Sequence, residues 1–114
     1  MNADDFRELA LGLEGAVESA HMGHPDFRVN GRIFATLQAN MESGCVMLAP
    51  DEQQEFLRAG AKTFTPASGA WGRQGSTMVR LAGADPAAVR SAITMAWERA
   101  LTLPSRKKTR SSRK

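Results

Sequence analysis

The sequence predicts an α+β domain: an antiparallel β-sheet with a β-hairpin at 26–38, covered on one face by an N-terminal and a C-terminal helix. Three observations predict it. Asn30-Gly31 separates two apolar runs, and Asn-Gly favours a two-residue hairpin because both residues accept a positive φ. Apolar residues recur at helical spacing over 3–13, and again after Asp85-Pro86, a typical helix start. Helices at both ends with strands between them indicate the α+β class.

The first element is a helix over 3–13. Asn2 is a candidate N-cap, and acidic residues in the first turn suit the positive end of the helix dipole. Gly12 and Gly15 end the helix. Its apolar face consists of Phe6, Leu9, Ala10 and Leu13.

The middle of the chain alternates strands with one further helix. Pro50 suits the first turn of that helix, and Gly60 suits its end. The stretch 61–75 is rich in loop-forming residues, with a short extended piece at 63–65. The predicted strands are 17–22, 26–29, 32–38, 44–48 and 76–82, and the last helix is 86–102, ending before Pro104.

The hairpin leaves two alternatives open. A two-residue loop puts Val29 opposite Arg32 and Phe27 opposite Phe34, and opposed residues share a face. If the helices cover the other face, Phe27 and Phe34 form an exposed aromatic pair beside Arg32, which suits stacking on bases. Alternatively, both rings are core and Arg32 lies at the sheet edge. Trp71, in the Gly-rich stretch 69–76, either plugs the open face of the sheet or meets a ligand.

The basic charge of the chain is concentrated at its C-terminus. Of 114 residues, 15 are Lys or Arg and 12 are Asp or Glu. The segment 105–114 holds six of the basic residues and no acid, so 1–104 carries nine basic and twelve acidic residues, a net charge of −3. We expect one domain at 1–104 and a tail at 105–114 that is disordered alone. Such a tail either attracts polyanions or is simply solvated.

The cysteine content, the length of the apolar runs and the charge of the first residues limit the classes of protein to which the chain can belong. The single cysteine, Cys45, excludes an internal disulfide framework and is expected to be buried. No apolar run approaches the ~20 residues of a membrane span, and the acidic start, Asp4-Asp5, does not resemble a signal peptide. These features predict a cytoplasmic protein without a membrane partner.

Catalytic signatures are mostly missing. His21 and His24 lie three apart without acids or cysteines in ligand spacing, so we expect no metal. The stretch 72–77 resembles an anion nest, but it lacks the Gly-Lys-Ser/Thr ending of a phosphate-binding loop. We therefore expect no cofactor and lean against an enzyme, although an activity is not excluded.

Three segments carry a family resemblance. They are the hairpin from His24 to Ala35, the stretch Trp71-Gly72-Arg73 and the strand Met78 to Leu81. In pattern and order they resemble the MmcQ/YjbR family of small bacterial proteins, and the resemblance extends over 1–103. It implies a double-wing, DNA-binding-like architecture.

The resemblance implies a nucleic-acid-binding protein, accessory or regulatory, with DNA favoured. The sequence leaves the oligomeric state open, and a monomer is favoured. The candidate contacts are Arg28, Arg32, Trp71, Arg73 and Arg80 in the domain, with Arg106, Lys107, Lys108 and Arg110 in the tail. The alternative is a small-molecule or protein-interaction module. It would use an aromatic pocket formed by His24, Phe27, Phe34 and Trp71, without nucleic acid.

Overall fold

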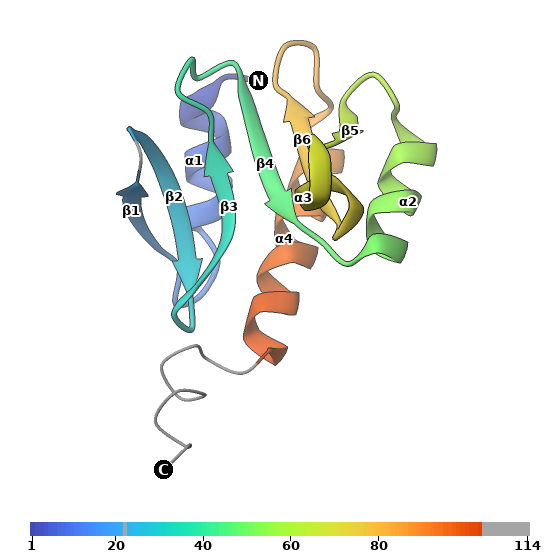
Figure 1. Ribbon diagram of the computed structural model, residues 1–114. Helices are drawn as coiled ribbons and strands as arrows, with labels where there is room; N and C mark the ends of the chain where they lie inside the picture. Colours follow the sequence, from blue (N-terminus) through green and yellow to red (C-terminus); the bar gives the residue numbers. More distant parts are fainter. Residues whose placement is uncertain (22, 104–114) are drawn as a thin grey trace.

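The computed structural model describes residues 1–21 and 23–103, and within them the predicted α+β fold is confirmed (Figure 1). One antiparallel sheet has the strand order β1-β2-β3-β4-β6-β5. The strands are β1 (Val17–His21), β2 (His24–Val29), β3 (Arg32–Leu37), β4 (Ser43–Met47), β5 (Phe64–Pro66) and β6 (Ser76–Arg80). The helices are α1 (Ala3–Leu11), α2 (Pro50–Ala59), α3 (Gly69–Arg73) and α4 (Pro86–Thr102).

Local sequence signals account for the longer helices. The Asn2 side chain accepts from the Asp5 N–H at 2.9 Å, while the Asp5 carboxylate accepts from the Asn2 N–H at 3.0 Å, so both ends of this capping box are made. Asp85 caps α4 by accepting from the Ala87 N–H. The main departure is α3, a one-turn helix within the stretch expected to be loop-rich.

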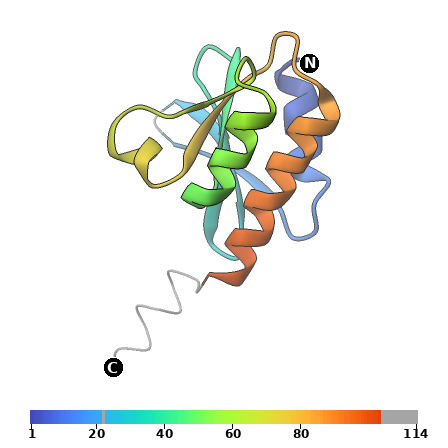
Figure 2. The same ribbon diagram turned by 90° about the vertical axis from the view of Figure 1, so that its right-hand side faces the viewer.

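Helices α1 and α4 lie on one face of the sheet, and α3 lies on the other side, as Figures 1 and 2 together make clear. Helix α2 packs at the β5 edge. We call the face opposite α1 and α4 the open face. None of the helices in 1–21 and 23–103 has the length and apolar character required to cross a bilayer.

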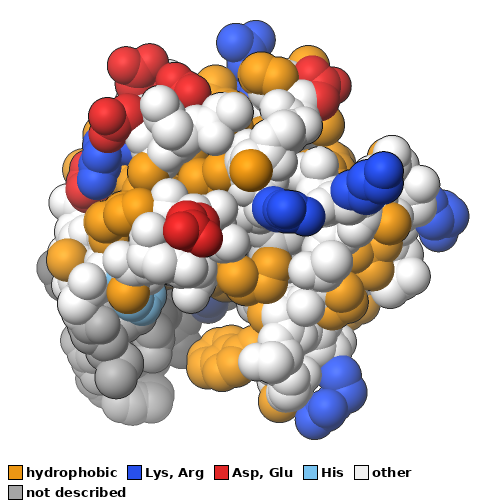
Figure 3. Space-filling model, turned by 90° about the horizontal axis from the view of Figure 1, so that it is seen from above, with side chains coloured by type: hydrophobic (Ala, Val, Ile, Leu, Met, Phe, Trp, Pro, Cys, Tyr) orange, Lys and Arg blue, Asp and Glu red, His pale blue; other side chains and the backbone are white. Residues whose placement is uncertain are grey.

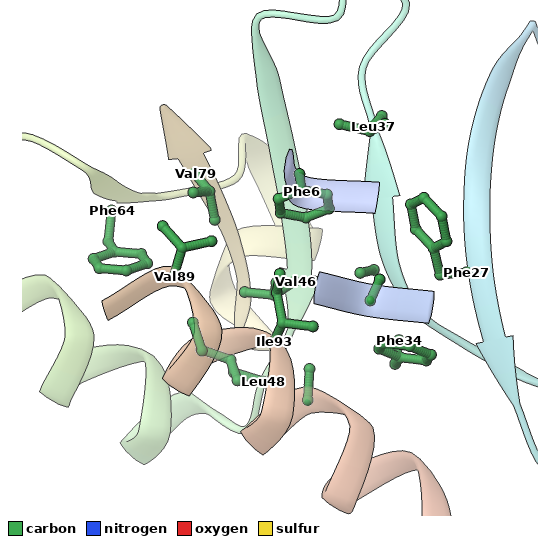
Figure 4. Packing of buried hydrophobic residues seen from close by; sticks show 14 of the residues in the cluster. Phe6, Phe27, Phe34, Leu37, Val46, Leu48, Phe64, Val79, Val89 and Ile93 are labelled. Carbon is green, nitrogen blue, oxygen red and sulfur yellow. The ribbon is translucent and has the colours of Figure 1, made fainter. Parts of the chain in front are cut away.

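The core lies between the sheet and the helices α1 and α4 (Figure 4). Phe6 of α1 packs against Phe27 with ring centroids 6.2 Å apart. Gly44 of β4 lies directly beneath the Phe6 ring, since a Cβ at this position would stand 2.7 Å from two of the ring carbons. The missing side chain therefore lets α1 approach the sheet closely.

The hairpin contains a β-bulge that the sequence did not reveal. Val29 pairs with Arg32 as predicted, but Phe27 pairs with Ala35, so its predicted pairing with Phe34 is wrong. The register shifts because Phe34 is an extra residue between the Arg28–Ile33 and Phe27–Ala35 pairs. Phe27 and Phe34 still share the face toward the helices and are 0% exposed. The bulge turns Ala35 and Leu37 to that face as well, and Thr36 to the opposite one, the reverse of the expected facing. Of the two alternatives, the core position holds and the exposed aromatic pair does not.

Strands β3 and β6 are each antiparallel to β4, so they run in the same direction and begin at the same end of the sheet. We call this the hairpin end, because the β2–β3 turn lies there. The Asn30 side chain donates to the Leu103 carbonyl at 3.3 Å, which places the end of α4 beside this turn. The predicted tail, 105–114, lies outside the described residues.

Candidate functional site

The open face carries a row of paired residues that crosses all six strands. Residues that are paired across antiparallel strands share a face of the sheet. Because Gly44 and Val46 of β4 face the helices, Cys45 between them faces the opposite side. The middle of the row is closed to solvent: Asp26 is 0% exposed, and Thr36 and Cys45 are each 6% exposed. The complete row is Ser19, Asp26, Thr36, Cys45, Met78 and Thr65.

Arg28 lies on this face, but its charge is compensated. Its guanidinium donates through Nε and Nη2 to the two Asp26 carboxylate oxygens, at 2.8 and 3.1 Å. This hydrogen bond is the main reason why the pKa of Arg28 is raised above its ordinary value. Arg28 is therefore poorly suited to attracting a phosphate.

Helix α3 presents Trp71 and Arg73 to solvent. The Trp71 side chain is 70% exposed, and Arg73 is also exposed. A large aromatic side chain with this exposure is unusual, because burying its apolar surface is favourable by several kcal/mol (about 25 cal/mol per Å²). Of the two predicted roles for Trp71, plugging the sheet is excluded by this exposure, and contact with a ligand stays a prediction.

The short helix is held in place by contacts from outside itself. The Gln53 side chain of α2 is buried and donates at 3.0 Å to the carbonyl oxygens of both Gly72 and Ser76. Gly72 packs so closely on the Ala67 backbone that a Cβ would overlap it. Gly75 has a φ of +114° and packs equally closely on the Leu48 carbonyl. The exposed Trp71 thus stands on a fixed support.

The other candidate arginines are not gathered around Trp71. Arg32 begins β3 at the hairpin end and shares the helix-covered face with Val29, its cross-strand partner. Arg80 ends β6, so it lies at the opposite end of the sheet from the start of that strand. The structure therefore divides the predicted basic residues between two faces and two ends. Arg106, Lys107, Lys108 and Arg110 lie outside the described residues.

The predicted aromatic pocket is not formed among the described residues. Phe27 and Phe34 are in the core. His24 is in β2, which β3 and β4 separate from β6, a distance of ~14 Å at about 4.8 Å per strand. Trp71 precedes β6, so it does not share a pocket with His24.

A different cavity exists, which the sequence did not predict. It is a groove of about 780 Å³ at the end of the sheet opposite the hairpin end. Its lining comes from the β3–β4 turn, the loop after α2, β5 and the end of β6, together with the start of the chain. Of the predicted site residues, only Arg80 lines it. Because the lining is drawn from several separate segments, no local sequence signal could have found it.

Two further findings bear on chemistry. Within 1–21 and 23–103, no three His, Cys, Asp or Glu side chains are grouped so as to hold a metal ion. Cys45 is buried as predicted, and desolvation raises the pKa of its thiol to about 11. Its thiolate, the nucleophilic form, is therefore scarce at neutral pH.

The comparisons with known proteins agree with the fold. A family model described as YjbR matches residues 11–99. The chain belongs to the YjbR family. The resemblance inferred from the hairpin, from Trp71-Gly72-Arg73 and from the strand that follows is thereby confirmed.

A solved structure is also similar to this YjbR family member. The crystal structure of protein DR2400 from Deinococcus radiodurans, described as a DUF419 domain, matches with a TM-score of 0.77 at 14% sequence identity. The match covers 96% of this chain and 86% of that one. At this identity the likeness concerns the fold. The comparison with curated proteins gives no match.

Proposed function

We propose that this YjbR family member is a cytoplasmic nucleic-acid-binding protein of accessory or regulatory kind, with DNA as the favoured ligand. In the domain, Trp71 and Arg73 of α3 are the principal contacts. In the segment 105–114, Arg106, Lys107, Lys108 and Arg110 add attraction that is independent of base sequence. The double-wing, DNA-binding-like description implied by the family resemblance belongs to this proposal.

The observation that carries the proposal is the exposed Trp71 on its fixed support. An exposed aromatic ring on a fixed backbone can stack on a base, a contact worth about 1–3 kcal/mol per base. Arg73, two residues along the same short helix, forms no ion pair with any described residue. Its guanidinium can therefore contact the phosphate next to a stacked base.

Acidic and basic residues are unevenly distributed over the molecule. The first eighteen residues contain Asp4, Asp5, Glu8, Glu14 and Glu18, on or beside α1, away from α3. The basic segment follows Leu103, at the hairpin end where β6 also begins. Three further acidic residues, Asp51, Glu52 and Glu55, lie on α2, whose Gln53 contacts α3, so the attraction of a polyanion to this region rests on the basic segment.

Fluorescence anisotropy with labelled single-stranded and duplex oligonucleotides tests the proposal on the full chain. Trp71→Ala should weaken binding about 5- to 150-fold, the range equivalent to one lost stacking contact. Arg73→Gln should weaken binding of all sequences similarly and reduce the salt slope by about one unit. Trp71→Ala should leave the melting temperature nearly unchanged, because its side chain is exposed.

The matched control is Arg90→Gln. Arg90 is an exposed arginine of α4, on the helix-covered side, so this variant removes the same charge without touching α3. Its binding should stay close to that of the wild type. Wild-type affinity and salt slope in both Trp71→Ala and Arg73→Gln would exclude α3 as the contact.

A further inference from the structure

The groove at the end of the sheet opposite the hairpin is a second feature of the molecule, separate from α3. Its volume of about 780 Å³ lies within the ~300–1,000 Å³ typical of small-ligand sites. Figure 3 looks onto this end, where Lys and Arg side chains stand along the centre and right, with hydrophobic surface beside them. The Asp and Glu side chains are grouped mainly at the upper left.

Two methionines form the apolar part of the groove. Met78 enters it from β6, and Met41 enters it from the β3–β4 turn, where it is 40% exposed. Methionine side chains are flexible and polarisable, so they adapt to apolar ligands of differing shape. The fully buried Leu81 extends this apolar surface.

Met41 adopts a backbone conformation that methionine disfavours. Its φ is +62°, in the left-handed region where Gly or Asn is usual. The turn imposes this conformation through two hydrogen bonds: the Met41 N–H donates to the Gln38 carbonyl, and the Glu42 N–H donates to the Asn40 side chain, each at 2.9 Å. An apolar side chain thus stands in a wall of the groove at some conformational cost, and backbone outliers of this kind cluster at ligand-binding sites.

Two cations flank the apolar wall. The Arg80 N–H donates to the Thr63 carbonyl at 2.8 Å, which brings the end of β6 against the loop that carries Lys62. Both side chains line the groove, and neither forms an ion pair with any described residue. Glu42 is the one acidic residue among the lining side chains. The groove therefore combines an apolar surface with a net positive charge.

We propose that this groove binds an amphipathic anion, a small molecule with an apolar body and one carboxylate or phosphate group. Arg80 and Lys62 hold the anionic group, and Met41 and Met78 contact the apolar body. A neutral apolar molecule leaves both cations unused, and a small hydrophilic anion leaves the methionines uncovered. The site is independent of the nucleic-acid function proposed for α3.

Isothermal titration of the full chain with sodium octanoate, octyl phosphate, octanol and inorganic phosphate tests the proposal, at concentrations below micelle formation. Octanoate or octyl phosphate should bind at least about tenfold more tightly than octanol or inorganic phosphate, as expected for a charge-assisted hydrogen bond added to apolar contact. The tighter of the two binders identifies the anionic group. Equal binding of octanol and both amphipathic anions would overturn the proposal.

Two variants separate the groove from the basic segment 105–114, which also attracts anions. Arg80→Gln should weaken binding of the amphipathic anion at least about tenfold, whereas the control Arg90→Gln should not. Met41→Gly leaves every charge in place and relieves the backbone strain, so its melting temperature should be equal or higher while octyl-chain binding weakens. Unchanged binding in folded Met41→Gly and Arg80→Gln variants would show that the anion binds outside the groove and would overturn the proposal.

Discussion

Cys45 lies at the centre of the open face, paired across the strands with Thr36 and Met78. Its thiol is removed from water, which raises its pKa from the ordinary 9.0 to about 11, against a smaller lowering by a backbone hydrogen bond with Thr77. The folded protein therefore keeps this proton over a pH range in which the unfolded chain loses it.

This difference makes stability depend on pH in a predictable direction. Between pH 9 and 11 the unfolded state binds fewer protons at Cys45 than the folded state, so the free energy of unfolding falls as pH rises. The loss attributable to Cys45 should reach about 2 kcal/mol near pH ~10.5. Urea denaturation at pH ~8 and ~10.5 measures it, with Cys45→Ala as the reference. The same pH dependence in wild type and variant would contradict the expectation.

Single residues differ in how far the sequence predicts their surroundings. The pairing of Val29 with Arg32 follows from Asn30-Gly31 alone, because both residues of the turn take positive φ values of 55° and 74°. The turn places Phe34 on one face with Val29, but it does not say that the helices cover this face, nor does it reveal the bulge that turns Ala35 and Leu37 to the same side. A local rule fixes the turn, and the core decides the face.

Among the elements, α3 depends most on contacts outside itself. A helix of one turn has little stability of its own, and its position rests on the two hydrogen bonds from Gln53 and on close packing at Gly72 and Gly75. Its support is therefore tertiary.

Gln53→Leu should expose this dependence. The variant keeps the volume of the side chain but leaves the carbonyl oxygens of Gly72 and Ser76 without their side-chain donor. We expect a loss of about 1–3 kcal/mol in the free energy of unfolding, measured by urea denaturation. Binding that relies on Trp71 should weaken in parallel, even though Gln53 is buried and contacts no ligand. The exposed, neighbouring Gln54→Leu is the matched control, and an equal loss in both variants would argue against the bridging role.

The contrast between local signals and tertiary contacts also explains which helices can be predicted from the sequence. Helix α4 begins and ends as expected, because Asp85 and Pro86 specify its start locally and its apolar residues recur along its length. Helix α3 was expected to be a loop, because its five residues, GAWGR, include two glycines and offer no helical period. Elements whose information is local can be predicted, and those fixed by neighbours cannot.

At the scale of the whole molecule, the domain and the basic segment differ in charge sign. Residues 105–114 carry six of the fifteen basic residues, while 1–104 has a net charge of −3. Non-specific attraction to DNA should therefore depend mainly on the segment, whereas the stacking contact proposed for α3 should be less sensitive to salt.

Removing residues 105–114 tests this division. Six cations neutralise at most about six phosphates, so the slope of log K against log salt should become shallower by up to about five units. Anisotropy titrations of the full chain and of 1–104 at several salt concentrations give both slopes, and circular dichroism checks that the shorter chain is folded. Identical affinity and slope would make the segment a bystander.

The residues of α3 and those of the groove are distributed differently along the chain. This difference explains why sequence reasoning found the first group and not the second. Trp71 and Arg73 are neighbours in the chain, so their association could be seen directly. Arg80 and Lys62 come together only through the backbone hydrogen bond between Arg80 and Thr63, and Met41 reaches the same groove from a turn far away in the sequence. Such a site exists only once the strand order is known.

The close contact between Phe6 and Gly44 has a consequence for the order in which the chain folds. The Phe6 ring can settle only after β4 has taken its place, because Gly44 supplies the space beneath it. Strands β1 to β4 are neighbours in the sheet in chain order, so each pairing closes a short loop. The contact between α1 and β4, by contrast, closes a long loop that contains β1, β2 and β3. We therefore expect α1 to dock after the folding barrier, so that weakening this contact speeds unfolding and leaves the folding rate almost unchanged. The helix that comes first in this domain is then among the last of its elements to be fixed.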